Sequence, residues 1–168
     1  QGNEVGVAFS NDLNATSWVK YPKQIVAFPD DRDKAWGVGQ PSAFSLDREG
    51  SVLLTYTRGD TKGTGVLFCR LDMSDMDNLK VGGAKSVSSM GFNISLHNCD
   101  FAVDETNQKV VGVFSGTCPD VYPSYIESYQ CVAYTALDLF LEGKGTWTRL
   151  PNIDSSVTGF YRNHNACL

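Results

Sequence analysis

Short apolar runs separated by polar turns dominate the pattern of this sequence. Ser51–Thr57 and Lys109–Ser115 are rich in β-branched and aromatic residues. Each follows a polar segment suited to a tight turn, Asp47–Gly50 in the first case and Asp104–Gln108 in the second. Runs of this length and composition, bounded by turn residues, predict strands joined in hairpins.

Further runs extend the same pattern. Val66–Leu71 and Gln130–Thr135 read as two more strands, while Ala136–Glu142 suits a helical turn. No segment holds the 3.6-residue period of an amphipathic helix for long, and Pro and Gly interrupt the chain throughout. The prediction is an all-β fold.

An internal repeat favours one architecture. The run Gln40–Asp47, a turn and a strand recur as His97–Asp104, a turn and a strand, and His164–Leu168 begins a third unit. The first two units start 57 residues apart and the next two 67. A period of this size suits a four-stranded antiparallel blade of a β-propeller, whose first strand lines the central channel.

The predicted domain is therefore a single partial β-propeller over residues 1–168. Its approximate blades are the outer strands of one blade (1–36), a second blade (37–94), a third (95–160) and the start of a fourth (161–168). A propeller closes with about four to eight blades. We therefore expect a fragment of a longer protein, or a second chain that completes the ring.

Some segments carry a resemblance to a known family. Ser10–Leu13 followed by Trp18–Pro22 resembles the outer-strand signature of five-bladed propeller glycosidases, the arabinanase and β-xylosidase group (glycoside hydrolase family 43 and relatives). Trp36–Ser42, Thr55–Asp60 and Arg162–Asn165 resemble segments of uncharacterised secreted proteins with a similar propeller. The resemblance implies the fold and, with less specific motifs, a glycoside hydrolase with three carboxylates around the channel.

Two acidic residues are the catalytic candidates. Asp100 heads a predicted channel-lining strand, and Glu127 lies in a Pro- and Tyr-rich loop. Glycoside hydrolysis needs two carboxyl groups about 5 Å apart for retention or about 6.5–9.5 Å for inversion. The alternative is that Asp100 fixes the start of a strand through backbone amides, and that Glu127 is a solvated loop residue.

Polar side chains at the unit starts are the binding candidates, because convergent amides and imidazoles can hydrogen-bond sugar hydroxyls. Trp36, which precedes a channel strand, is the best candidate for stacking on a sugar. Arg162 could clamp a carboxylate or a hydroxyl pair, or form an ordinary surface ion pair. The remaining members of this set are Gln40, His97, Asn98, His164 and Asn165. No cofactor or metal site is predicted, although the resembled glycosidases leave open a calcium or other ion near the axis.

Composition narrows the partners. The chain has 168 residues, 42% of them hydrophobic, and a formal net charge of −5. Because its Lys and Arg are scattered, neither nucleic acid nor an anionic membrane is expected as a partner. A carbohydrate is the expected ligand.

Cysteines and sequons bear on the compartment. Asn14 and Asn93 fit the N-glycosylation pattern. Among five cysteines, Cys118 and Cys131 bracket one loop and are predicted to form a disulfide. The pairing of the others is left open; these are Cys69, Cys99 and Cys167. Secretion is expected, the alternative being reduced, buried thiols in a cytosolic protein.

Three functions follow. The first is a secreted glycoside hydrolase in its full-length form. The second is a non-catalytic, lectin-like propeller that binds carbohydrate, and the third is a secreted scaffold domain. Paired carboxylates near one pocket would distinguish the first, and stacked aromatics with amides the second.

Overall fold

The chain is built almost entirely of β-strands, which confirms the predicted all-β class. The computed structural model describes residues 2–27, 36–60, 63–87, 97–117, 128–163 and 167–168. The strands are β1 (Ala8–Phe9), β2 (Val19–Lys20), β3 (Gly37–Ser45), β4 (Ser51–Asp60), β5 (Gly63–Asp72), β6 (Lys80–Val81), β7 (Lys85–Ser86), β8 (His97–Asp104), β9 (Lys109–Thr117), β10 (Ser128–Ala136) and β11 (Thr148–Arg149). The helices are α1 (Leu137–Glu142) and α2 (Ser155–Thr158).

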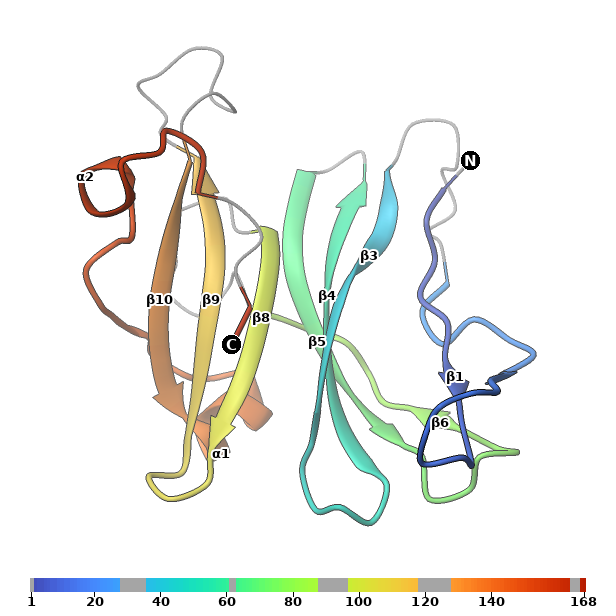
Figure 1. Ribbon diagram of the computed structural model, residues 1–168. Helices are drawn as coiled ribbons and strands as arrows, with labels where there is room; N and C mark the ends of the chain where they lie inside the picture. Colours follow the sequence, from blue (N-terminus) through green and yellow to red (C-terminus); the bar gives the residue numbers. More distant parts are fainter. Residues whose placement is uncertain (1, 28–35, 61–62, 88–96, 118–127, 164–166) are drawn as a thin grey trace.

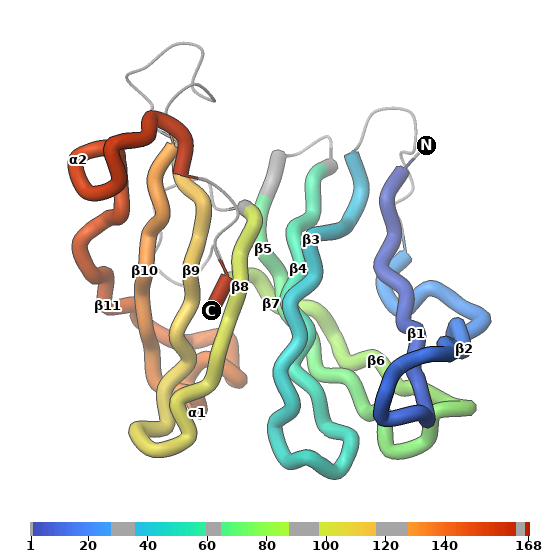
Figure 2. Tube along the Cα trace, in the orientation of Figure 1, coloured from blue at the N-terminus to red at the C-terminus, as the bar shows by residue number. Residues whose placement is uncertain are grey.

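Three antiparallel sheets lie side by side (Figure 1). The N-terminal pair is β1–β2. The central sheet has the order β3-β4-β5-β6, with β7 also on β5. The C-terminal sheet has the order β8-β9-β10-β11. The Cα trace in Figure 2 shows the central sheet between the other two.

A polar turn precedes the second strand of each large sheet, β4 in the central sheet and β9 in the C-terminal sheet. The Asp47 carboxylate accepts hydrogen bonds from the backbone N–H groups of Glu49 (2.8 Å) and Ser51 (3.0 Å). In the C-terminal sheet, Asp104 accepts from the backbone of Asn107 at 3.0 Å. An Asx turn of this kind satisfies the backbone where the chain reverses, so the sequence signal for both hairpins has a direct structural cause.

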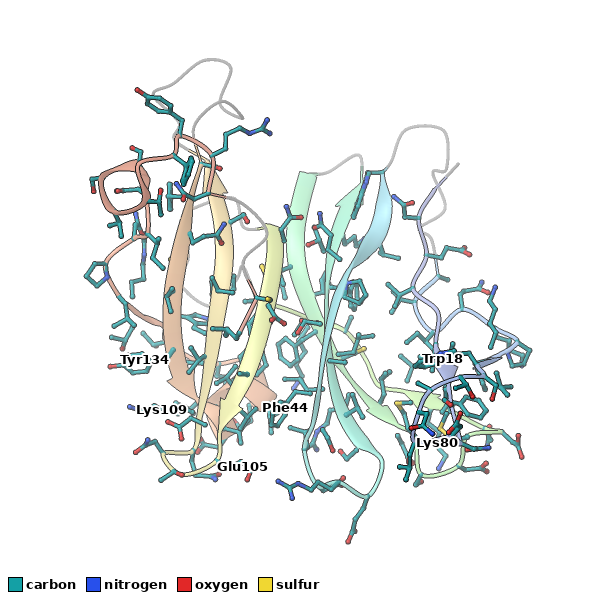
Figure 3. The ribbon with its side chains drawn as sticks, viewed as in Figure 1. Trp18, Phe44, Lys80, Glu105, Lys109 and Tyr134 are labelled. Atoms are coloured by element: carbon teal, nitrogen blue, oxygen red, sulfur yellow. The ribbon has the colours of Figure 1, made fainter. Side chains whose placement is uncertain are left out.

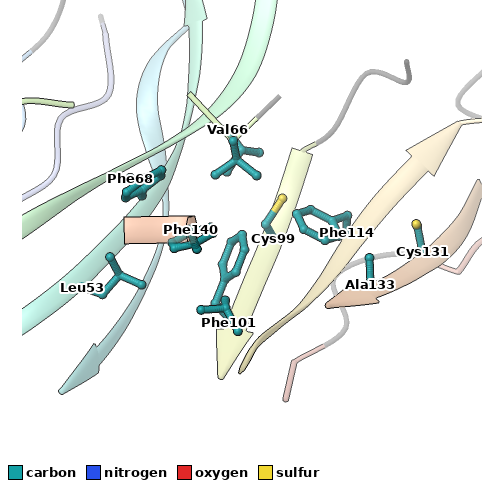
Figure 4. Packing of buried hydrophobic residues seen from close by; sticks show 11 residues of the cluster. Leu53, Val66, Phe68, Cys99, Phe101, Phe114, Cys131, Ala133 and Phe140 are labelled. Atoms are coloured by element: carbon teal, nitrogen blue, oxygen red, sulfur yellow. The ribbon is translucent and has the colours of Figure 1, made fainter. Parts of the chain in front are cut away.

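The largest apolar cluster lies between the central and C-terminal sheets, and its aromatic rings are shown in Figure 4. Phe140 of α1 is fully buried and stacks on Phe68 of β5 with 4.4 Å between ring centroids. Phe101 and Phe114 of the C-terminal sheet meet edge to face at 5.3 Å. A second cluster joins the other face of the central sheet to the N-terminal segment; its buried members are Val5, Ile25, Val38, Leu54, Tyr56, Cys69 and Leu71.

The two large sheets share one register, with corresponding residues 58 positions apart. Ser42 pairs with Thr55 in the central sheet, and Asp100 pairs with Val113 in the C-terminal sheet. The sequence comparison matched Gln40 with His97, at 57 residues, and was wrong by one position. Gln40 corresponds to Asn98, because the two sheets are offset by 58 positions on both sides of a bulge that they share: Gly39 matches His97, and Ser42 matches Asp100.

The predicted helical turn after β10 is confirmed as α1. Gly143 ends the helix in the left-handed conformation at φ 77° and donates to the carbonyl of Phe140. Among the described residues, the structure contains no helix that is long and apolar enough to cross a membrane.

Candidate functional site

Among the described non-glycine residues with positive φ, Gln40 and Asn98 lie inside strands, in the bulges of β3 and β8, whereas Ala15, Arg48 and Gln108 lie between strands. The β3–β4 register shifts between Gly39 and Ser42. Inside the bulge Gln40 has a φ of 53°, and its counterpart Asn98 in β8 has 47°. Residues other than glycine seldom adopt a positive φ, although Asn does so more readily than most. Strained residues of this kind cluster at functional sites, so two amides at matching positions mark a candidate site.

Direct hydrogen bonds join the two bulges. The side-chain oxygen of Gln40 accepts from the backbone N–H of Asn98 at 3.2 Å. Two residues further along, the hydroxyl of Ser42 donates to a carboxylate oxygen of Asp100 and accepts from the backbone N–H of Phe101 at 3.3 Å. The bulged ends of β3 and β8 therefore lie against each other, and their polar side chains form one network.

Asp100 has hydrogen-bond partners on both carboxylate oxygens. Besides Ser42, one oxygen accepts from the backbone N–H of Phe101 at 3.0 Å. The other oxygen accepts from the backbone N–H of Leu168 at 2.8 Å. All three donors belong to the chain itself, so the carboxylate ties β3, β8 and the C-terminal residues together.

The same connection occurs twice along the chain. Ser42 accepts from the residue after Asp100, and Asp100 accepts from the residue after Cys167. Cys167 stands 67 residues beyond Asp100, the spacing that the third unit has in the sequence. Each unit thus presents a polar acceptor to the backbone of the next.

An exposed aromatic ring borders the Gln40 bulge. The Trp36 side chain is 44% exposed, and its ring lies over Gly39. A Cβ atom at Gly39 would stand 3.1 Å from the ring atom Cη2, so only glycine leaves the indole its present position without a shift. The carbonyl of Trp36 accepts from the backbone N–H of Asn3 at 3.2 Å, which holds the residue in place. An exposed aromatic surface and the exposed amide of Gln40 therefore lie at the same end of β3, while Asn98 is buried beside them in β8.

Other predicted site residues fall elsewhere or outside the description. Arg162 is exposed and forms a parallel β-bridge with Ser128 at the start of β10. The following candidates lie outside the described residues: Asn93, Cys118, Glu127, His164, Asn165 and the side chain of His97. The predicted pairing of Asp100 with Glu127 therefore stays a prediction.

The sequon at Asn14 lies on an exposed turn. Asp12 accepts from the backbone N–H groups of Asn14 (2.9 Å) and Thr16 (3.1 Å). Hydrogen bonds from Thr16 and from these amides hold the pKa of Asp12 below its usual value. The turn displays the Asn14 side chain to solvent.

The predicted disulfide between Cys118 and Cys131 is not supported. Cys131 is a free thiol with no exposed surface, within the cluster between the two large sheets. It pairs with Phe114, three residues before β9 ends at Thr117. Cys118 itself lies outside the described residues. Burial raises the pKa of the Cys131 thiol.

Sequence reasoning missed Ser42, which connects the bulges. Ser42 could have been found from the repeat, because an offset of 58 residues places Ser42 at the position that Asp100 has in the next unit. Within the described ranges, no group of His, Cys, Asp and Glu side chains is arranged to hold a metal ion.

A separate hollow of about 510 Å³ lies at the opposite end of the strands, between the β3–β4 and β8–β9 turns. Phe44 and Glu105 are among its lining residues and are labelled in Figure 3. It is distinct from the network around Gln40.

Comparison of the chain with protein-family models, with curated proteins and with solved structures gives no match.

Proposed function

We propose that this chain is part of a β-propeller, in which the central and C-terminal sheets are consecutive blades. Three features support the proposal. The sheets share one register, their first strands carry the same bulge, and those strands meet through a connection that recurs at Leu168. Repetition of a four-stranded antiparallel unit around an axis, with first strands innermost, is the propeller arrangement.

The proposed function is carbohydrate binding at the bulged end of β3 and β8. The observation that carries it is the 44% exposed indole of Trp36 over Gly39, one residue before the exposed amide of Gln40 in the bulge of β3. Sugars present apolar C–H faces and rings of hydroxyl groups. An aromatic surface suits the former, and amides, which both donate and accept, suit the latter.

Binding without hydrolysis accounts best for Asp100. Both oxygens of Asp100 accept hydrogen bonds from groups of the chain itself, one hydroxyl and two backbone N–H groups, which are the contacts of a residue that joins strands. The alternative, a glycoside hydrolase, requires Glu127 as the second catalytic carboxyl group beside Asp100. Assay of the titration mixtures described next for released reducing sugar tests it.

Calorimetric titration with xylohexaose and arabinohexaose tests the proposal. We expect one of them to bind, and Trp36→Ala to weaken that binding about tenfold, equivalent to the ~1.4 kcal/mol that an aromatic contact contributes. Trp18→Ala is the matched control, since Trp18 is also exposed but lies on β1–β2 side of the molecule (Figure 3). Equal affinity of wild type and Trp36→Ala would overturn this site, and release of reducing sugar that stops in Asp100→Asn would establish the hydrolase instead.

Secretion belongs to the same proposal, supported by the exposed sequon at Asn14. Expression through a secretory pathway should add a glycan that peptide N-glycosidase removes, and Asn14→Gln should lower the glycan mass. An unmodified Asn14 in secreted material would remove this support.

A further inference from the structure

The hollow between the β3–β4 and β8–β9 turns is a second candidate site, at the opposite end of the strands from the bulges. Its volume is about 510 Å³, within the range of about 300–1,000 Å³ that small-molecule sites occupy. Figure 3 labels one lining residue from each large sheet, Phe44 on β3 and Glu105 in the β8–β9 turn. Both sheets therefore contribute to this hollow, which the carbohydrate proposal does not use.

The floor of the hollow is apolar and is fixed by the core. Its apolar lining residues, all partly buried, are Phe44, Leu46, Val103 and Leu137. Three of them, Leu46, Val103 and Leu137, also pack against the buried cluster between the two large sheets. Phe44 pairs with Leu53 of that cluster across β3 and β4. A ligand therefore meets an apolar surface that is already in place, as in most small-molecule sites.

The rim of the hollow carries two non-glycine residues with positive φ, Arg48 at 60° and Gln108 at 52°. With the repeat offset of 58 positions, Gln108 occupies the place that Gly50 has in the central sheet. The side-chain nitrogen of Gln108 donates to the carbonyl of Glu105 at 2.7 Å, and its own carbonyl accepts from the backbone N–H of Leu137 at 2.9 Å. These two bonds fix one wall of the hollow against α1. Residues that their surroundings hold in such a conformation cluster at ligand sites.

Opposite charges line the hollow from different sheets. Arg48 belongs to the β3–β4 turn and Glu105 to the β8–β9 turn, and both residues are exposed. Among the described residues, neither the Arg48 guanidinium nor the Glu105 carboxylate forms an ion pair. Asp47 also lines the hollow, but one of its oxygens accepts two backbone N–H groups of its own turn. Because a guanidinium binds a carboxylate and a carboxylate binds an ammonium through charge-assisted hydrogen bonds, the hollow offers one partner for each end of a zwitterion.

From these observations we propose that the hollow binds a short apolar peptide with free termini. The C-terminal carboxylate of the peptide meets Arg48, its N-terminal ammonium meets Glu105, and its apolar side chains lie on Phe44 and the other residues of the floor. Packed sheets stand about 10 Å apart, and three extended residues span about 10 Å, so a tripeptide matches the distance between the two walls. The inference rests on neither the propeller nor the carbohydrate proposal, because the residues of the hollow are separate from the bulges.

Calorimetric titration with trileucine tests the proposal. N-acetyl-trileucine amide has the same apolar side chains without the terminal charges, and triglycine has the charges without the apolar side chains. We expect trileucine to bind, and each of the other two peptides to bind at least about tenfold more weakly, because each lacks one of the two groups that the hollow contacts.

Charge reversal tests the two walls separately. Arg48→Glu and Glu105→Lys each replace an attraction by a repulsion and should weaken trileucine binding about tenfold. Lys23→Glu is the matched control, because Lys23 is exposed in the N-terminal segment, away from the hollow. All three substitutions change exposed side chains, and circular dichroism confirms that each variant is folded. No binding of trileucine, equal affinity for the blocked peptide or for triglycine, or wild-type affinity in Arg48→Glu or Glu105→Lys would each overturn the proposal.

Discussion

Replacement of Asp100 by alanine tests whether this residue holds the strands together or performs chemistry. The carboxylate accepts from Ser42, Phe101 and Leu168. After truncation the Phe101 N–H keeps Ser42 as an acceptor, and water reaches the exposed Leu168. The uncompensated loss is then one hydrogen bond to a charged group, about 1.5–3 kcal/mol of the free energy of unfolding.

Thermal unfolding followed by circular dichroism measures this loss. Since about 1 kcal/mol shifts Tm by roughly 2–4 °C in a chain of this size, a loss of about 1.5–3 kcal/mol in Asp100→Ala should lower Tm by about 3–12 °C. Asp100→Asn keeps one acceptor oxygen and should lose less. Asp77→Ala is the control, because Asp77 is exposed and surface changes stay within about 0.5 kcal/mol. An unchanged Tm in Asp100→Ala would refute the structural role and return Asp100 to the catalytic candidates.

Three further predictions concern the core, the pH dependence and the thiols. Phe140→Ala should lower the free energy of unfolding, measured by urea denaturation, by about 3–5 kcal/mol, because Phe140 is fully buried between the sheets. Gly112→Ala should also lower it, because the new Cβ would stand 2.6 Å from a ring atom of Phe114. Wild-type stability in either variant would contradict the described core. Hydrogen bonds from Ser74 and then from Lys80 lower the pKa of Asp72 to about 2, so its stabilisation should be full above its ordinary pKa of 3.8 and disappear as pH falls through about 2. Unfolding across this range should show a shallower acid decline for Asp72→Asn, and identical profiles would exclude the effect. In the native protein, iodoacetamide should label the exposed Cys167. Cys99 should react only after unfolding, because burial raises the pKa of its thiol. Peptide mass mapping that finds Cys99 labelled in the native state would contradict this.

The strands and hairpins were predictable because their signals are local. Ser51–Thr57 and Lys109–Ser115 combine β-branched residues with a preceding turn, and both lie within observed strands, β4 and β9. The repeat was visible for the same reason. Its register was off by one because the match rested on polar side chains, Gln40 against His97, whereas strand pairing sets the true offset of 58 positions.

Contacts between distant residues were beyond the reach of the sequence. Ser42 and Asp100 are 58 positions apart, and their hydrogen bond depends on how two sheets pack. The predicted disulfide between Cys118 and Cys131 lacks support for a related reason. The proximity of Cys131 to Cys118 along the chain suggested a bridge, but the β9–β10 register turns Cys131 into the core opposite Phe114.

Hydrogen–deuterium exchange with and without xylohexaose and arabinohexaose tests the central claim most directly, because it locates binding on the chain without a substitution. The account predicts slower exchange in peptides that cover residues 36–44 and 97–102 with one of these sugars, and unchanged exchange around β1 and β2. Protection elsewhere, or no protection by either sugar, would contradict a carbohydrate site at the bulges of β3 and β8.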